Sequence, residues 1–110
     1  MSVKINGTTI TMTRGDTLKV LVTIVNADGT EYEPVEGDSI RFAMKASYNA
    51  DILIRKNIPI DTLLLHLEPE DTKSLKMPKE YFYDIELTHA NGDVDTFIAN
   101  AKLKLSEEVD

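Results

Sequence analysis

Apolar and polar side chains alternate along most of this chain, with the period of two that places successive residues on opposite faces of a β-strand. Ile40, Phe42 and Met44, for example, share one face of such a strand, and Ser39, Arg41 and Lys45 lie on the other. This one-sided pattern is typical of antiparallel sheets that have one face on the core and one in water. It predicts about seven strands: residues 8–13, 18–24, 40–46, 52–58, 63–67, 81–88 and a long final strand that ends at Leu105.

The strand predicted over residues 52–58 carries Arg55 and Lys56 and is followed by Pro59. Proline cannot donate a hydrogen bond to a β-ladder, and charged side chains discourage pairing with other chains. We therefore expect this strand to lie at the edge of its sheet.

A short helical turn is predicted before the strand at residues 81–88. Pro69 is suited to a first helical turn, and Glu70 and Asp71 are favourable near its positive end. Pro78 stops the turn. We expect a turn over residues 70–75, with Leu75 and Met77 facing inward, that connects the two sheets at one end of a sandwich.

The last two strands form a hairpin whose register can be predicted. A two-residue Asn91-Gly92 loop would place Ile85 opposite Ile98 and scramble the apolar face. A three-residue loop of residues 90–92, with Gly92 in the left-handed conformation, keeps that face continuous. It predicts the pairs Ile85–Phe97, Tyr83–Ala99 and Tyr81–Ala101.

Residues 27–29 (Ala-Asp-Gly) have a composition similar to that of the final loop. We expect the same bulged turn there, which places Tyr32 beside Ile24.

These elements predict an all-β fold, an Ig-like antiparallel β-sandwich of about seven strands with one short helical turn before the penultimate strand. The 110 residues suffice for one domain, residues 1–110, in which residues 106–110 form an acidic tail. Phe42, Tyr83, Ile85 and Phe97 are expected to share its core.

Composition narrows the classes of partner. The net charge is −7, from 19 acidic and 12 basic side chains, so we expect no nucleic-acid partner. There is no cysteine, hence no disulfide and no thiolate metal site. No signal peptide and no run of about 20 apolar residues is evident, and we expect neither secretion by a signal peptide nor a membrane partner.

Candidate chemistry is sparse. His66 and His89 lie on different predicted elements, without a carboxylate or second histidine at metal-ligand spacing. Asp84 and Glu86 share a strand face, and close carboxylates can form glycosidase or calcium sites, but an outward sheet surface is the preferred interpretation. We predict no catalytic, cofactor-binding or metal-ligating residue and no cofactor, and expect that the protein is not an enzyme.

Two short motifs have simpler interpretations. Arg14-Gly15-Asp16 is the tripeptide that integrins bind, yet it lies between two strands, where glycine and aspartate favour a turn. Residues 107–110 (EEVD) are similar to the chaperone tail bound by tetratricopeptide domains. A frayed acidic tail, or the start of a linker, is the preferred interpretation.

Four segments together resemble a known family: residues 10–18 (ITMTRGDTL), 26–30 (NADGT), 67–72 (LEPEDT) and 83–87 (YDIEL). They are similar to the small β-sandwich domains of structural proteins in tailed phages and prophages of Gram-positive bacteria, such as the N-terminal domain of upper baseplate proteins. The resemblance extends from about Ile10 to Leu105.

The resemblance implies a non-enzymatic tail or baseplate module of the virion, assembled in the host bacterial cytoplasm. Its partners would be other tail or baseplate proteins, with self-association as a further option. A baseplate protein usually continues into a stalk, whereas this chain stops at Asp110. The alternative is a bacterial surface or carbohydrate-binding β-sandwich, which would need exposed aromatic side chains or a calcium loop.

Overall fold

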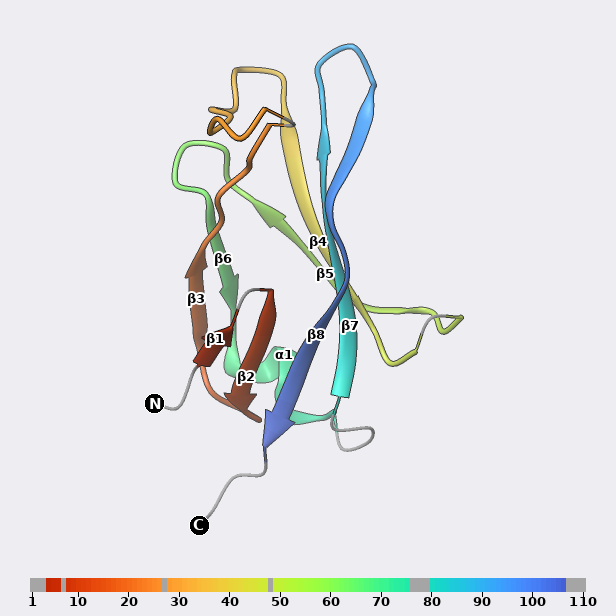
Figure 1. The fold of residues 1–110 in the computed structure, drawn as a ribbon. Helices are drawn as coiled ribbons and strands as arrows, with labels where there is room; N and C mark the ends of the chain where they lie inside the picture. The colour runs from red at the N-terminus through yellow and green to blue at the C-terminus, as the bar shows by residue number, and fades with distance from the viewer. Residues whose placement is uncertain (1–3, 7, 27, 48, 76–79, 107–110) are drawn as a thin grey trace.

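A computed structural model describes residues 4–6, 8–26, 28–47, 49–75 and 80–106. This part of the chain contains eight strands and one short helix (Figure 1). The predicted all-β class is confirmed. In chain order the elements are β1 (Lys4–Asn6), β2 (Thr9–Thr13), β3 (Leu18–Leu21), β4 (Ser39–Lys45), β5 (Ile52–Ile58), β6 (Leu64–Leu67), α1 (Pro69–Lys73), β7 (Glu80–Thr88) and β8 (Val94–Ser106).

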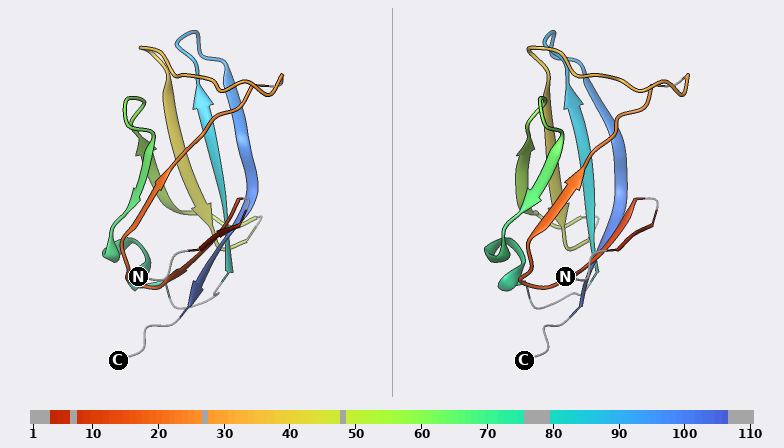
Figure 2. Two further views of the ribbon diagram at one scale, coloured as in Figure 1. Left: turned by 60° about the vertical axis from the view of Figure 1, so that its left-hand side comes forward. Right: turned by 90° about the vertical axis from the view of Figure 1, so that its left-hand side faces the viewer.

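The strands form two sheets of unequal size that face each other (Figure 2). The larger has the order β1-β2-β8-β7-β4-β5, and the smaller contains β3 and β6. The strand at Ile52–Ile58 is an edge strand, as predicted. One pairing departs from the antiparallel expectation, because β2 runs parallel to the C-terminal part of β8, with Ile10 opposite Leu103. β8 is longer than β7, and β2 pairs with the C-terminal end of β8.

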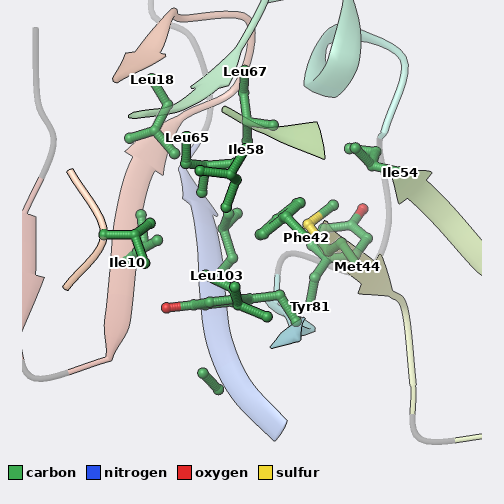
Figure 3. Close-up of a cluster of buried hydrophobic side chains, with 14 of the residues drawn as sticks. Ile10, Leu18, Phe42, Met44, Ile54, Ile58, Leu65, Leu67, Tyr81 and Leu103 are labelled. Atoms are coloured by element: carbon green, nitrogen blue, oxygen red, sulfur yellow. The ribbon is translucent and has the colours of Figure 1, made fainter. Parts of the chain in front are cut away.

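The core lies between the two sheets and is built from the predicted alternation. Phe42, Tyr83 and Ile85 are buried together, and the rings of Phe42 and Tyr83 lie 5.3 Å apart. Phe97 packs against the core cluster but is only partly buried, so it belongs to the margin of the core. Figure 3 shows side chains of the small sheet, such as Leu65 and Leu67, pointing toward those of the large one.

The small sheet is shorter than predicted. β3 ends at Leu21, although Val22 and Ile24 remain buried, because the chain leaves β6 and crosses toward β8. Leu63 has a positive φ of 55° and precedes β6 instead of belonging to it. The backbone pairing between β3 and β6 ends at the hydrogen bond that the Val22 amide donates to the Leu63 carbonyl at 2.8 Å.

Helix α1 connects the two sheets, as predicted. It begins at Pro69, and the Asp71 carboxylate accepts a hydrogen bond from the Glu68 amide at 2.7 Å, which satisfies a backbone donor at the helix start. Leu75 packs against the core. The expectations for Met77 and Pro78 lie outside the described residues.

The final hairpin has the predicted loop but not the predicted pairs. The His89 amide donates to the Asp93 carbonyl at 2.8 Å, which encloses residues 90–92, and Gly92 has a φ of 94°. Farther from the loop, however, Ile85 lies opposite Ile98, Tyr83 opposite Ala101 and Tyr81 opposite Leu103. The three predicted pairs, Ile85–Phe97, Tyr83–Ala99 and Tyr81–Ala101, are therefore wrong.

Two irregularities in the β7–β8 ladder cause this difference. Each adds one residue on β8, so the register shifts by two in total and the apolar residues of the C-terminal half still face inward. Asn100 adopts a φ of 52°, and its amide donates to the Asp84 carboxylate at 2.7 Å. As a result Ala99, which was predicted on the apolar face opposite Tyr83, is exposed.

The turn after β3 repeats the geometry of the final loop. The Asn26 amide donates to the Thr30 carbonyl at 2.7 Å, Gly29 has a φ of 90°, and the Tyr32 amide donates to the Ile24 carbonyl. The predicted placement of Tyr32 beside Ile24 is confirmed, while Ala27 lies outside the described residues. Within the described part of the chain, no helix is both long and apolar enough to span a membrane.

Candidate interaction site

The residues considered for chemistry from the sequence are distributed over separate surfaces. His66 is on the outer face of the small sheet, 3.3 Å from the Glu68 carboxylate. Asp84 accepts the Asn100 amide, and Glu86 forms an ion pair with Arg41 at 2.7 Å. Asp84 and Glu86 thus each bond to a neighbouring strand, and both line a hollow of about 210 Å³ that also contains Arg55.

The Arg14-Gly15-Asp16 segment forms the turn predicted for it. Gly15 has a φ of 84°, and the Asp16 amide donates to the Thr13 carbonyl at 3.1 Å. Arg14 is buried, and the Gly15 amide donates to the buried Thr72 hydroxyl at 2.8 Å. The turn is therefore packed against α1 and is part of the fold. Residues 107–110 lie outside the described residues.

One polar cluster was missed by the sequence analysis, because the fold brings its members together from different segments. The two ring nitrogens of His89 lie 3.6 Å from Asp38 and 2.9 Å from Asp95. The Tyr32 hydroxyl donates to Asp38 at 2.6 Å, and the Tyr32 and His89 rings meet edge-on. A sequence signal existed only for Asp38, which follows Gly37 directly before a strand.

The electrostatics of this cluster follow from its hydrogen bonds. The hydrogen bond from Tyr32 lowers the pKa of Asp38, assisted by the Val35 amide, and the same bond raises the pKa of Tyr32. The hydrogen bond to Asp95 raises the pKa of His89. Both His89 nitrogens face carboxylates, with Nε2 within hydrogen-bond distance of Asp95 and Nδ1 at 3.6 Å from Asp38, so the ring links these two side chains.

Among the described residues, no group of three or more histidine, cysteine, aspartate or glutamate side chains has the geometry to hold a metal ion. Two further hollows lie on opposite faces of the large sheet.

The first hollow, called the outer hollow, lies on the solvent face of the large sheet and has a volume of about 400 Å³. It forms where β8 is irregular near Asn100. Its lining mixes one aromatic ring with charged and amide groups: Ala43, Lys45, Ser47, Phe82, Asp84, Thr96, Ala99 and Asn100.

The second hollow, called the β3 opening, leads into the sandwich between β3 and the large sheet and has a volume of about 300 Å³. Its lining is mainly apolar, and Leu65, Tyr83 and Ile85 reach it from the core. The Tyr83 hydroxyl donates to the Thr8 carbonyl at one end of the opening. Sequence alternation could not show this feature, because it depends on how much of the large sheet the small one covers.

Each sheet also has an unpaired strand edge that exposes apolar side chains. β5 is the last strand of the large sheet on one side, and β3 is an edge of the small sheet on the other. Exposed leucines mark both edges, with Leu53 of β5 47% exposed and Leu21 of β3 72% exposed. An unpaired strand that also exposes apolar side chains can bind another protein by strand addition.

Comparison with known proteins gives no match: no protein-family model, no curated protein and no solved structure matches the chain.

Proposed function

We propose that this protein is a non-enzymatic structural module of a phage or prophage tail or baseplate. It acts through protein–protein contacts with other tail or baseplate proteins, and belongs to a virion assembled in the cytoplasm of the host bacterium. Self-association is a further contact of the same kind.

The observation that carries this proposal is the exposure of apolar side chains on two unpaired strand edges, at Leu53 and Leu21. Such edges favour aggregation unless a partner or a charged residue covers them. On β5, Arg55 and Lys56 restrict which partner fits. The resemblance of residues 10–105 to tail and baseplate sandwich domains supplies the class of partner.

A carbohydrate-binding module is the second candidate, and the outer hollow is the observation in its favour. Phe82 offers a ring for stacking on a sugar, and Lys45, Asp84 and Asn100 offer polar groups. The Asp84 carboxylate already accepts the Asn100 amide, which reduces its capacity for a ligand. Tyr48, a second aromatic residue that could stack on a sugar, lies outside the described residues.

The test is capture of the products of adjacent genes by the immobilised full chain, run beside a glycan array. The proposal expects capture of a tail or baseplate protein, unaffected by Phe82→Ala. If the neighbouring genes encode no phage protein and the chain instead binds a glycan with a requirement for Phe82, the carbohydrate-binding function replaces the proposed one.

A further inference from the structure

The two open sides of the sandwich differ. On the β5 side, β5 and β6 lie side by side and the Lys56 ammonium reaches the Asp71 carboxylate of α1 at 2.9 Å, which closes the sandwich. On the other side, β2, with β1 beyond it, pairs with β8 and borders the β3 opening at Ile10, but no described strand pairs with the free edge of β3. The inner face of the large sheet is reached from this side.

The backbone of β3 is oriented for an additional strand. In an antiparallel pair, successive residues direct their N–H and C=O groups alternately toward and away from the partner. Because the Val22 amide bonds to Leu63 on the β6 side, the backbone groups of Lys19 and Leu21 point to the open side. A segment that pairs there would place every second side chain in the β3 opening.

The side chains at this edge match such an occupant. Inward residues of an added strand would meet the apolar lining of the opening, including Ile10, Tyr83 and Ile98. On the outer face, Leu21 is 72% exposed and would form a cross-strand pair with the occupant. An occupant with alternating apolar side chains therefore covers apolar surface on both faces of β3.

Charge gives the occupant a second property. β3 runs toward the end of the molecule where the 22–38 segment and the 88–96 hairpin meet through Tyr32, Asp38 and His89. These two segments contain no lysine or arginine. Their acidic residues are Asp28, Glu31, Glu33, Glu36, Asp38, Asp93 and Asp95. A partner that approaches this end is attracted if it carries lysine or arginine.

We propose that the free edge of β3 binds an extended segment of a partner protein, in which apolar side chains alternate and lysine or arginine lies at the end next to the 22–38 segment. The segment adds a strand to the small sheet and fills the β3 opening. This inference rests on the proposed function in one respect, namely that the domain works through contacts with other proteins.

The experiment is selection of a displayed library of random 12-residue peptides on the full chain. The inference expects enriched peptides with alternating apolar residues and net positive charge. Leu21→Glu should weaken their binding about tenfold or more, since it places a carboxylate in an apolar contact. The matched control is Leu53→Glu, on the other exposed edge, which should leave their affinity unchanged.

Three results would overturn the inference: no enrichment, enriched peptides without a positive bias, or loss of binding with Leu53→Glu but not with Leu21→Glu. Light scattering on the unmodified chain gives a fourth result that would overturn the inference. If the chain is a dimer and Leu21→Glu dissociates it, the β3 edge binds a second copy of the chain instead of a partner protein. Because the selection uses no phage protein, its failure is distinguishable from failure of the proposed function, which the capture of neighbouring gene products tests.

Discussion

At the scale of single residues, two buried tyrosines illustrate how the same side chain has different energetic roles. Tyr81 and Tyr83 face the core from β7. The Tyr83 hydroxyl donates to the Thr8 carbonyl and thereby attaches the start of β2 to the core. The Tyr81 hydroxyl is buried without a hydrogen-bond partner among the described residues.

We expect Tyr83→Phe to lower the free energy of unfolding by about 0.5–1.5 kcal/mol, since it removes one hydrogen bond. Tyr81→Phe should leave stability unchanged or raise it, because it removes a buried polar group without a bond. Urea unfolding of both variants measures the difference. A larger loss for Tyr81→Phe than for Tyr83→Phe would show that the polar contacts are assigned to the wrong ring.

His89 makes stability depend on pH. Its hydrogen bond to Asp95 raises the pKa of His89 in the folded protein, so the stabilisation is fully present below the unfolded pKa and is lost as pH rises through the folded one. The lowered pKa of Asp38 acts at a lower pH, where stability is lost as that carboxylate becomes protonated.

We therefore expect His89→Gln to cost more stability at about pH 5.5 than at about pH 8.5, on either side of the range in which histidine titrates. Thermal unfolding of both proteins at each pH measures this difference. Asp95→Asn is the matched control and should reduce the pH dependence, because it removes the main cause of the raised pKa. A difference between wild type and His89→Gln that is equal at both pH values would contradict the assignment.

At the scale of elements, two turns contain glycines with positive φ whose surroundings differ. Gly92, with a φ of 94°, has open space where a β-carbon would lie. Gly37 has a φ of 99°, but a β-carbon there would lie 2.7 Å from the β-carbon of Ala90 in the final loop. Gly37 therefore permits close packing of two loops as well as a turn.

Gly92→Ala should cost about 1–2 kcal/mol, from the left-handed backbone alone. Gly37→Ala should cost more, since it adds the steric clash with Ala90. Adding Ala90→Gly to Gly37→Ala should recover part of the extra cost, and a double-mutant cycle measures this coupling. Equal costs for the two glycine substitutions, with no recovery, would mean that the loops are not in contact.

The elements also show how far the sequence predicts the structure. Alternation placed Phe42, Tyr83 and Ile85 in one core, and the glycine in each loop identified both three-residue turns. The β7–β8 register was not predictable, because the irregularities near Asn100 depend on a hydrogen bond to Asp84 on another strand. Such contacts between distant residues leave no local pattern in a single sequence.

At the scale of the whole molecule, unequal sheets determine the surfaces available for binding. The sequence indicated the β5 edge through Pro59 and its charged neighbours, and the structure confirms that edge. The β3 opening and the His89 cluster were not predicted, because both arise where segments distant in sequence meet. A six-stranded sheet facing only two strands exposes part of its inner face on one side.

The central claim is that this domain works by binding other proteins, and light scattering on the purified chain tests it most directly. The chain is measured alone and then mixed with each protein that the adjacent genes encode. For at least one of these proteins, the account predicts a complex whose mass equals the sum of its components. Replacing an exposed edge leucine, Leu21 or Leu53, with glutamate should weaken the affinity of that complex. If every mixture shows only the separate masses of the chain and of the added protein, this result contradicts the central claim.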